Sequence, residues 1–162
     1  MSETEKYTLQ EAHEKFAKTF NGRVWELLEK SNRSQGEDEE ILIALCASVY
    51  HWRQVGTVVH EQRSQWLFAR VYASLGEPDK ALKHARACFE ITKSEPTKLQ
   101  DFDIAYAQEG LARAYAQMGE VDRAREHFEK AKTAGEAIAN PEDREIFMGD
   151  FNTGNWYGLK ID

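Results

Sequence analysis

The chain has 162 residues, of which 41% are apolar and 30% charged, and its net charge at pH 7 is −7. This composition is typical of a folded globular chain, and the acidic balance disfavours binding to the phosphates of a nucleic acid. No run of 18 apolar residues occurs, so no membrane-spanning helix is expected. The N-terminal residues lack a basic start followed by an apolar stretch, so we expect no secretory signal and predict a cytoplasmic protein.

Six long helices are predicted in chain order from apolar periodicity and from capping and turn signals. The first follows a capping box that starts at Thr8, and the second starts with the acids 37–40, which favour a helix N-terminus. Gly56 ends the second helix, and either Asp101 or Asp103 is expected to cap the fifth. The expected ranges are about 8–31, 37–55, 57–75, 78–94, 101–118 and 121–139.

The C-terminal part of the chain predicts a shorter helix and then an irregular tail. Asn140 and Pro141 interrupt the helical pattern, and the stretch EDREIFMGD that follows predicts a seventh helix that covers the apolar end of the stack. The last residues, FNTGNWYGLKID, are too rich in glycine for a helix. No segment alternates polar and apolar residues as a strand does, so the predicted class is all-α.

The two cysteines, Cys46 and Cys88, each lie within an apolar helical pattern. A cytosolic compartment keeps thiols reduced, and a free cysteine packs as a small hydrophobic side chain. We therefore expect both thiols to be reduced and buried in the core.

One short segment occurs twice in the chain. ASLGEPDKALKHA stands at 73–85 and AQMGEVDRAREHF at 116–128, and their glycines, Gly76 and Gly119, are 43 residues apart. Each copy has an apolar stripe on its first helix and a small residue where the second helix approaches. The matched pairs are Tyr72 with Tyr115, Ala73 with Ala116, Leu75 with Met118, Glu77 with Glu120, Asp79 with Asp122, Ala81 with Ala124, and His84 with His127.

This pattern resembles the tetratricopeptide repeat, whose helix hairpins carry a small residue and a tyrosine before a turn glycine and an alanine after it. The resemblance covers about 63–94 and 106–138, although the spacing of 43 exceeds the ~34 residues typical of the repeat. HWRQVGT and PEDREIF are also similar to parts of small bacterial repeat proteins. The resemblance implies a right-handed α-α superhelix of three antiparallel helix hairpins plus a short C-terminal capping helix.

The same resemblance implies one domain that spans 1–162. A chain of this length fits one domain, and about three hairpins are needed to bury a continuous core. The expected parts are a degenerate hairpin at 8–55, repeats at 57–94 and 101–139, and a capping helix with the tail at 141–162.

In tetratricopeptide proteins the first helices of the hairpins line a concave groove. Positions 13, 10 and 6 residues before each turn glycine share one helix face here, and two of the arginines can each hold a carboxylate by two hydrogen bonds. The resemblance thus implies a protein or peptide interaction module that binds an extended acidic segment or a terminal carboxylate. The candidate groove residues are Arg63, Trp66, Arg70, Tyr106, Glu109 and Arg113.

Other interpretations of these side chains and of the tail stay open. Arg70 and Arg113 can pair with Glu109 and keep the surface soluble, because surface ion pairs are common. The tail offers apolar groups from Trp156 to Ile161, which can seal the last helix, fill the chain's own groove or dock on a neighbouring copy. The last of these would make the chain a self-associating structural protein, so a homodimer stays open.

No complete catalytic or metal-binding motif occurs in the sequence. His13 and His60 each begin the zinc-protease pattern H-E-x-x-H without completing it, and no phosphate-binding loop, dinucleotide-binding fingerprint or nucleophile elbow is found. We therefore predict no enzyme, no cofactor and no metal. The open alternative is a small enzyme or metal-binding protein that uses His51 and His60, which flank the Gly56 turn.

Overall fold

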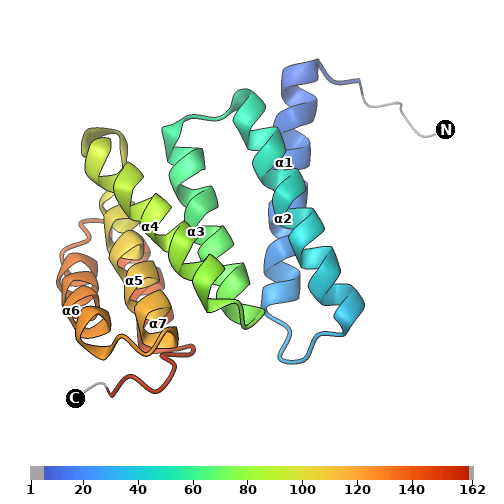
Figure 1. The fold of residues 1–162 in the computed structure, drawn as a ribbon. Coiled ribbons are helices and arrows are strands. Elements are labelled where there is room, and N and C mark those ends of the chain that lie inside the picture. Colours follow the sequence, from blue (N-terminus) through green and yellow to red (C-terminus); the bar gives the residue numbers. More distant parts are fainter. Residues whose placement is uncertain (1–5, 161–162) are drawn as a thin grey trace. The chain divides into compact units, whose positions relative to one another are not determined.

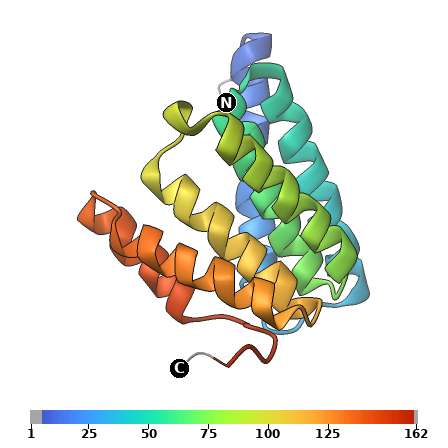
Figure 2. The ribbon, with the colours of Figure 1, turned by 60° about the vertical axis from the view of Figure 1, so that its left-hand side comes forward.

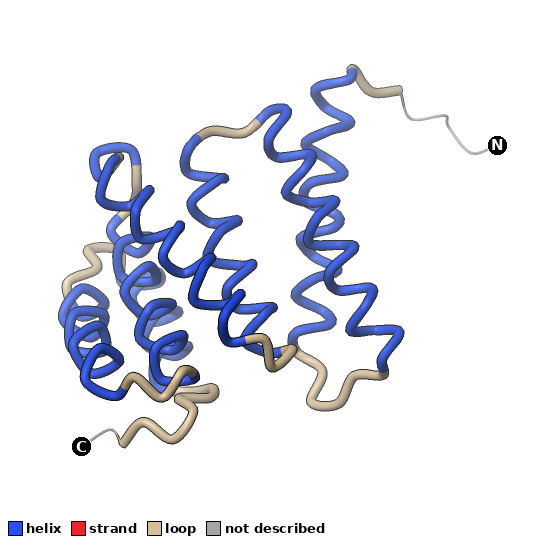
Figure 3. The backbone as a smooth tube through the Cα atoms, in the orientation of Figure 1, coloured by secondary structure: helices blue, strands red, loops and turns tan. Residues whose placement is uncertain are grey.

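A computed structural model describes residues 6–160, and this part of the chain consists of helices joined by short connections (Figure 1). Figure 3 shows no strand among these residues, which confirms the predicted all-α class. No helix in this range is both long and apolar enough to cross a membrane. The helices are α1 (Leu9–Leu28), α2 (Gln35–Val55), α3 (Val58–Ser74), α4 (Pro78–Ser94), a short 3-10 helix (Pro96–Lys98), α5 (Asp101–Gln117), α6 (Val121–Glu136) and α7 (Pro141–Asn152).

Local capping signals account for the ends of the first two helices. Thr8 forms the predicted capping box of α1, and Ser34 forms a second one with Glu37, so α2 begins two residues before the acids. α1 ends at Leu28 rather than near 31, and the guanidinium of Arg33 donates to the carbonyl of Leu27 at 3.2 Å, which satisfies part of the last turn.

The start of α5 differs from the prediction. Gln100 is the N-cap residue, and the Asp103 side chain accepts a hydrogen bond from the Gln100 backbone N–H at 3.0 Å. Asp101 instead accepts from the backbone N–H of Ala139 at 2.8 Å, beyond the end of α6 at Glu136. Both acids therefore satisfy orphan backbone donors, although neither occupies the N-cap position itself.

The described residues divide into two compact units, one ending at Glu61 and the other beginning at Gln62 within α3. In the first unit α1 and α2 form an antiparallel hairpin (Figure 1). Its core contains Val24, Leu27, Ile41 and Leu45, and the buried Ser48 hydroxyl donates to the carbonyl of Ala17 at 2.8 Å. The single domain and the right-handed superhelix stay predictions.

The second unit contains the rest of α3, the helices α4 to α7 and the tail. α5 and α6 form a hairpin, and α7 packs against both of them (Figure 2). The aromatic rings of Phe128, Phe147, Phe151 and Trp156 meet in this region, with centroid separations of 4.7 to 5.7 Å between neighbours. The C-terminal helix and the tail are therefore part of this unit's core.

Both copies of the repeated segment contain the same glycine turn between their two helices. Gly76 and Gly119 adopt φ values of 73° and 77°, in the left-handed region that glycine enters without steric cost. In both copies the residue after the glycine donates its backbone N–H to a tyrosine carbonyl in the last helical turn, at 2.9 Å. Each first helix thus ends in the same hydrogen-bonded glycine turn.

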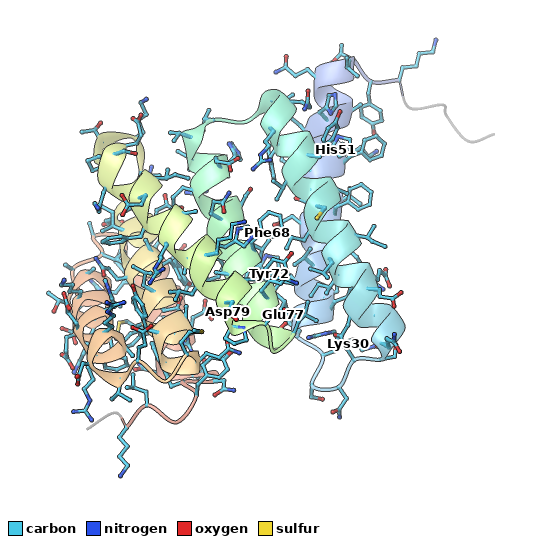
Figure 4. The ribbon with its side chains drawn as sticks, viewed as in Figure 1. Lys30, His51, Phe68, Tyr72, Glu77 and Asp79 are labelled. Carbon is cyan, nitrogen blue, oxygen red and sulfur yellow. The ribbon has the colours of Figure 1, made fainter. Side chains whose placement is uncertain are left out.

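The two copies also share a cluster of side chains around their matched histidines, His84 and His127. His84 Nδ1 lies 2.7 Å from Oε1 of Gln65, and the imidazole stacks on Phe68 and Tyr72, which lie one turn apart on α3 (Figure 4). His84 on α4 thereby links the two helices of its hairpin, because all three of its partners lie on α3. The second copy repeats the hydrogen bond at 2.7 Å and the tyrosine stacking at 5.6 Å with Gln108, Tyr115 and His127.

These two imidazoles predict a pH dependence of stability. Burial, with repulsion from Lys83 and Lys130 respectively, lowers the pKa of His84 and of His127. The unfolded chain, in which histidine has a pKa of about 6.5, therefore binds protons that the folded chain does not. We expect the free energy of unfolding to decrease as the pH falls from 7 to 5, and to decrease less in the H84Q/H127Q variant. Urea unfolding at both pH values checks this, and equal decreases in the two proteins would contradict it.

The two cysteines differ in burial, and the expectation of two core thiols is wrong for Cys46. Both are free, but Cys88 is buried, which raises the pKa of its thiol to about 12, whereas Cys46 is exposed. Ile43 and Tyr50 are exposed on α2 as well, three and four residues away from Cys46. The apolar pattern of α2 therefore includes a stripe that residues 6–61 leave exposed.

Candidate functional site

The six predicted groove residues all lie in the second unit, three on α3 and three on α5. Five of them, Glu109 included, form one cluster, and the sixth, Arg63, pairs with a different acid. The structure thus brings the two helix faces together as the helical spacing predicts. The carboxylate partners of these residues come from α5 itself and from α7.

Glu109 is the centre of the cluster, with only 1% of its side chain exposed. Trp66 donates its indole N–H to Glu109 at 3.1 Å, and Arg113 donates its Nε–H to the same carboxylate. Arg70 lies 3.9 Å from it, and the Tyr106 ring meets Trp66 edge-on at 5.0 Å. A buried carboxylate is stable only when it is paired and hydrogen-bonded, and these contacts supply both.

Arg63 is held by a second buried acid. Its Nε and Nη2 donate to the two carboxylate oxygens of Asp103 at 2.8 and 3.1 Å, and its guanidinium lies over the Phe102 ring at 5.0 Å. Asp103 is 3% exposed, whereas Arg63 is 46% exposed. The acid is thus enclosed, and the cation faces solvent in a fixed position.

The chain's own tail covers Arg113. Nη1 donates to the carbonyl of Asn155 at 2.8 Å, and Nη2 donates to the carbonyls of Asp150 and Thr153 at 2.9 and 3.0 Å. The guanidinium also lies 4.0 Å from the centroid of the Trp156 ring. The tail therefore contacts both a candidate groove residue, Arg113, and the last helix, where the Trp156 ring lies 5.3 Å from that of Phe151.

Tyr106 extends the cluster toward α7. Its hydroxyl donates to Oδ2 of Asp150 at 2.6 Å, and its ring meets that of Phe147 at 4.8 Å. Burial, followed by the hydrogen bond to Asp150, raises the pKa of Tyr106 well above its usual range. The phenol therefore stays protonated and acts here as a hydrogen-bond donor.

Sequence reasoning missed Asp103, Asp150 and Phe102 as members of the site. Asp103 was interpreted only as a capping group, although it binds the Gln100 N–H and the Arg63 guanidinium together. Asp150 stands 44 residues after Tyr106, and no local pattern links the two. The stacked Arg63–Phe102 pair likewise joins two different helices.

His51 and His60, the residues of the alternative interpretation, have separate partners in the first unit. His51 Nδ1 lies 2.8 Å from Nδ1 of His13, whereas His60 stacks on Trp52 at 4.1 Å and accepts from the Thr57 N–H at 3.1 Å. The structure therefore does not pair His51 with His60. Within residues 6–160, no group of three or more His, Cys, Asp or Glu side chains is placed to hold a metal ion.

Comparison with protein families matches residues 62–95 and 104–145, each to a model described as tetratricopeptide repeat. The first match covers α4 and most of α3, and the second covers most of α5, all of α6 and the start of α7. No curated protein and no solved structure matches the chain significantly. Tetratricopeptide repeats generally mediate interactions between proteins and are typically not catalytic. Its repeated hairpins and both family matches make this chain a tetratricopeptide-like helical repeat protein.

Proposed function

We propose that the chain is a non-catalytic, cytoplasmic protein-interaction module, and that its second unit binds an extended acidic segment, internal or C-terminal, along α3 and α5. The arrangement of Arg63 and Arg70 supports this proposal most directly. These cations are 46% and 31% exposed, each lies close to a buried carboxylate, and each is stacked on an aromatic ring. Fixed guanidinium groups lose little side-chain entropy when a carboxylate binds.

The spacing of the two arginines specifies the ligand further. Seven residues of α-helix rise about 10 Å. Three residues of a ligand in the polyproline II conformation cover about the same length, and its three residues per turn bring side chains i and i+3 to the same side. A ligand with acidic residues at positions i and i+3 therefore matches Arg63 and Arg70 better than one with adjacent acids.

The pair with Asp103 leaves part of the hydrogen-bonding capacity of Arg63 for a ligand. A guanidinium carries five N–H donors, and the pair with Asp103 uses two of those of Arg63. Hydrogen bonds between charged groups contribute roughly 1.5 to 3 kcal/mol each, about 10- to 150-fold in affinity. We therefore expect a short peptide to bind weakly and to bind best at low salt, where charges are screened least.

Fluorescence anisotropy with labelled ten-residue peptides tests the proposal. We expect wild type to bind a peptide with Glu at i and i+3 more tightly than one with Glu at i and i+1 or with Gln at both positions. In R63Q/R70Q we expect a loss of at least about tenfold. R86Q/R123Q, which removes two arginines from α4 and α6, is the matched control. Equal binding of the Glu and Gln peptides, or equal losses in both variants, would rule the proposal out.

A further inference from the structure

We propose that the segment 150–159, called the tail segment below, occupies the ligand position at Arg113, so that a partner binds there only by displacing it. This inference rests on the proposed function, because it states which part of the groove is closed in the free protein. Arg70 and Arg113 occupy equivalent positions in the two repeats, six residues before the turn glycine. Three backbone carbonyls of the tail segment accept hydrogen bonds from Arg113.

The tail segment is shaped around the guanidinium of Arg113. Gly154 has a φ of 77°, and a Cβ atom at this position would lie 3.2 Å from Nη1 of Arg113. Tyr157, at φ 51°, also adopts the left-handed conformation, which is uncommon for a residue other than glycine. The backbone therefore turns closely about Arg113 and presents its carbonyl oxygens to the cation.

The apolar side chains of the tail segment anchor it to the second unit. Trp156 and Leu159 are buried, and the Trp156 ring lies 4.9 Å from that of Phe128. The Trp156 indole N–H donates to the carbonyl of Phe151 at 3.1 Å. The tail segment thus combines three neutral acceptors for Arg113 with one aromatic ring beneath it.

A partner of suitable chemistry can replace this set of contacts. The acceptors that the tail segment offers to Arg113 are neutral carbonyls, whereas a carboxylate adds charge–charge attraction and can accept two parallel hydrogen bonds from a guanidinium. The carbonyls of a displaced tail segment regain hydrogen bonds to water. The partner that fits best is therefore an acidic segment that also carries an aromatic residue to take the place of Trp156.

The first experiment supplies the tail segment as a separate molecule. The probe is a labelled synthetic peptide of residues 149–160, and the proteins are the full chain and its W156A/L159A variant, each with helicity checked by circular dichroism. We expect the variant to bind the peptide at least tenfold more tightly than wild type, and we expect R113Q in the variant background to abolish the gain. Equal binding by wild type and a folded variant, or a gain that R113Q leaves intact, would overturn the inference.

A glycine pair in the full chain provides a second test that leaves the apolar anchors intact. Gly154 and Gly158 both have positive φ, so alanine strains the backbone at either position. Only at Gly154 would the added Cβ atom contact Arg113, since nothing lies within 4 Å of one at Gly158. We expect G154A to bind the tail peptide more tightly than G158A. Equal affinities would show that the contact with Arg113 does not close the site.

The acidic peptides separate this inference from the proposed function. We expect the i, i+3 Glu peptide to bind W156A/L159A more tightly than wild type. Equal binding to both proteins would leave the proposed function standing and overturn the inference about the tail. Failure of every acidic peptide to bind either protein would reject the proposed acidic ligand, and with it a tail that competes for that ligand.

Discussion

Replacement of Glu109 by alanine is expected to lower the free energy of unfolding by about 3 to 5 kcal/mol. The Glu109 carboxylate is buried and accepts hydrogen bonds from Trp66 and Arg113. Without it, the partly buried indole N–H of Trp66 loses this acceptor, and Arg113 loses the only acid paired with it in the described range. Removing one member of a buried ion pair leaves the other member desolvated, which costs more than the pair itself contributes.

Urea unfolding followed by circular dichroism measures this effect. Glu109→Gln keeps the shape and an acceptor for Trp66, so we expect a smaller loss than for alanine. The matched control is Glu126→Ala, which removes an exposed i, i+4 pair with Lys130 on α6. Exposed pairs of this kind contribute little, and a loss for Glu109→Ala no larger than that of the control would contradict the central role of Glu109.

Replacement of Gly135 by alanine is expected to destabilise the protein by about 3 kcal/mol, against the trend for glycine in a helix. Alanine normally stabilises a helix by up to about 1 kcal/mol relative to glycine. A Cβ atom at Gly135, however, would lie 2.1 Å from Cε1 of Phe147, whose side chain is fully buried. Such a contact requires α6 and α7 to separate, and the cost exceeds the gain in helix propensity.

Two other helical glycines serve as controls for this prediction. Nothing lies within 4 Å of a Cβ atom built on Gly22 in α1 or on Gly149 in α7. We expect Gly22→Ala and Gly149→Ala to raise the thermal midpoint slightly and Gly135→Ala to lower it by several degrees. A rise in the midpoint for Gly135→Ala would show that α6 and α7 do not pack as described.

Features governed by neighbours in sequence were predictable from the sequence. The Thr8 capping box and the Gly76 and Gly119 turns depend on residues within about one helical turn, and the structure contains each of them. The helical period also placed Arg63, Trp66 and Arg70 on one face of α3, where they contact α5. These signals are short-range, so one sequence is sufficient to identify them.

Features governed by packing between distant segments were not predictable in the same way. The three hydrogen bonds from Arg113 to the tail join residues 37 to 42 positions apart, and all of their acceptors are backbone carbonyls, which every residue type carries. Cys46 shows the same limit, because an apolar helical pattern does not reveal which stripe a neighbouring element covers. The partner of His51 likewise depended on how α1 packs against α2.

The hydrogen bond between Trp66 and Glu109 has a consequence for the evolution of the duplicated hairpin. These residues hold the same position in the two copies, 43 residues apart, and they contact each other directly. Two identical copies would oppose tryptophan to tryptophan or glutamate to glutamate, which removes either the acceptor or the donor. Divergence at this position is therefore a condition for the copies to stack, and an engineered array of identical consensus hairpins would need alternating residues there.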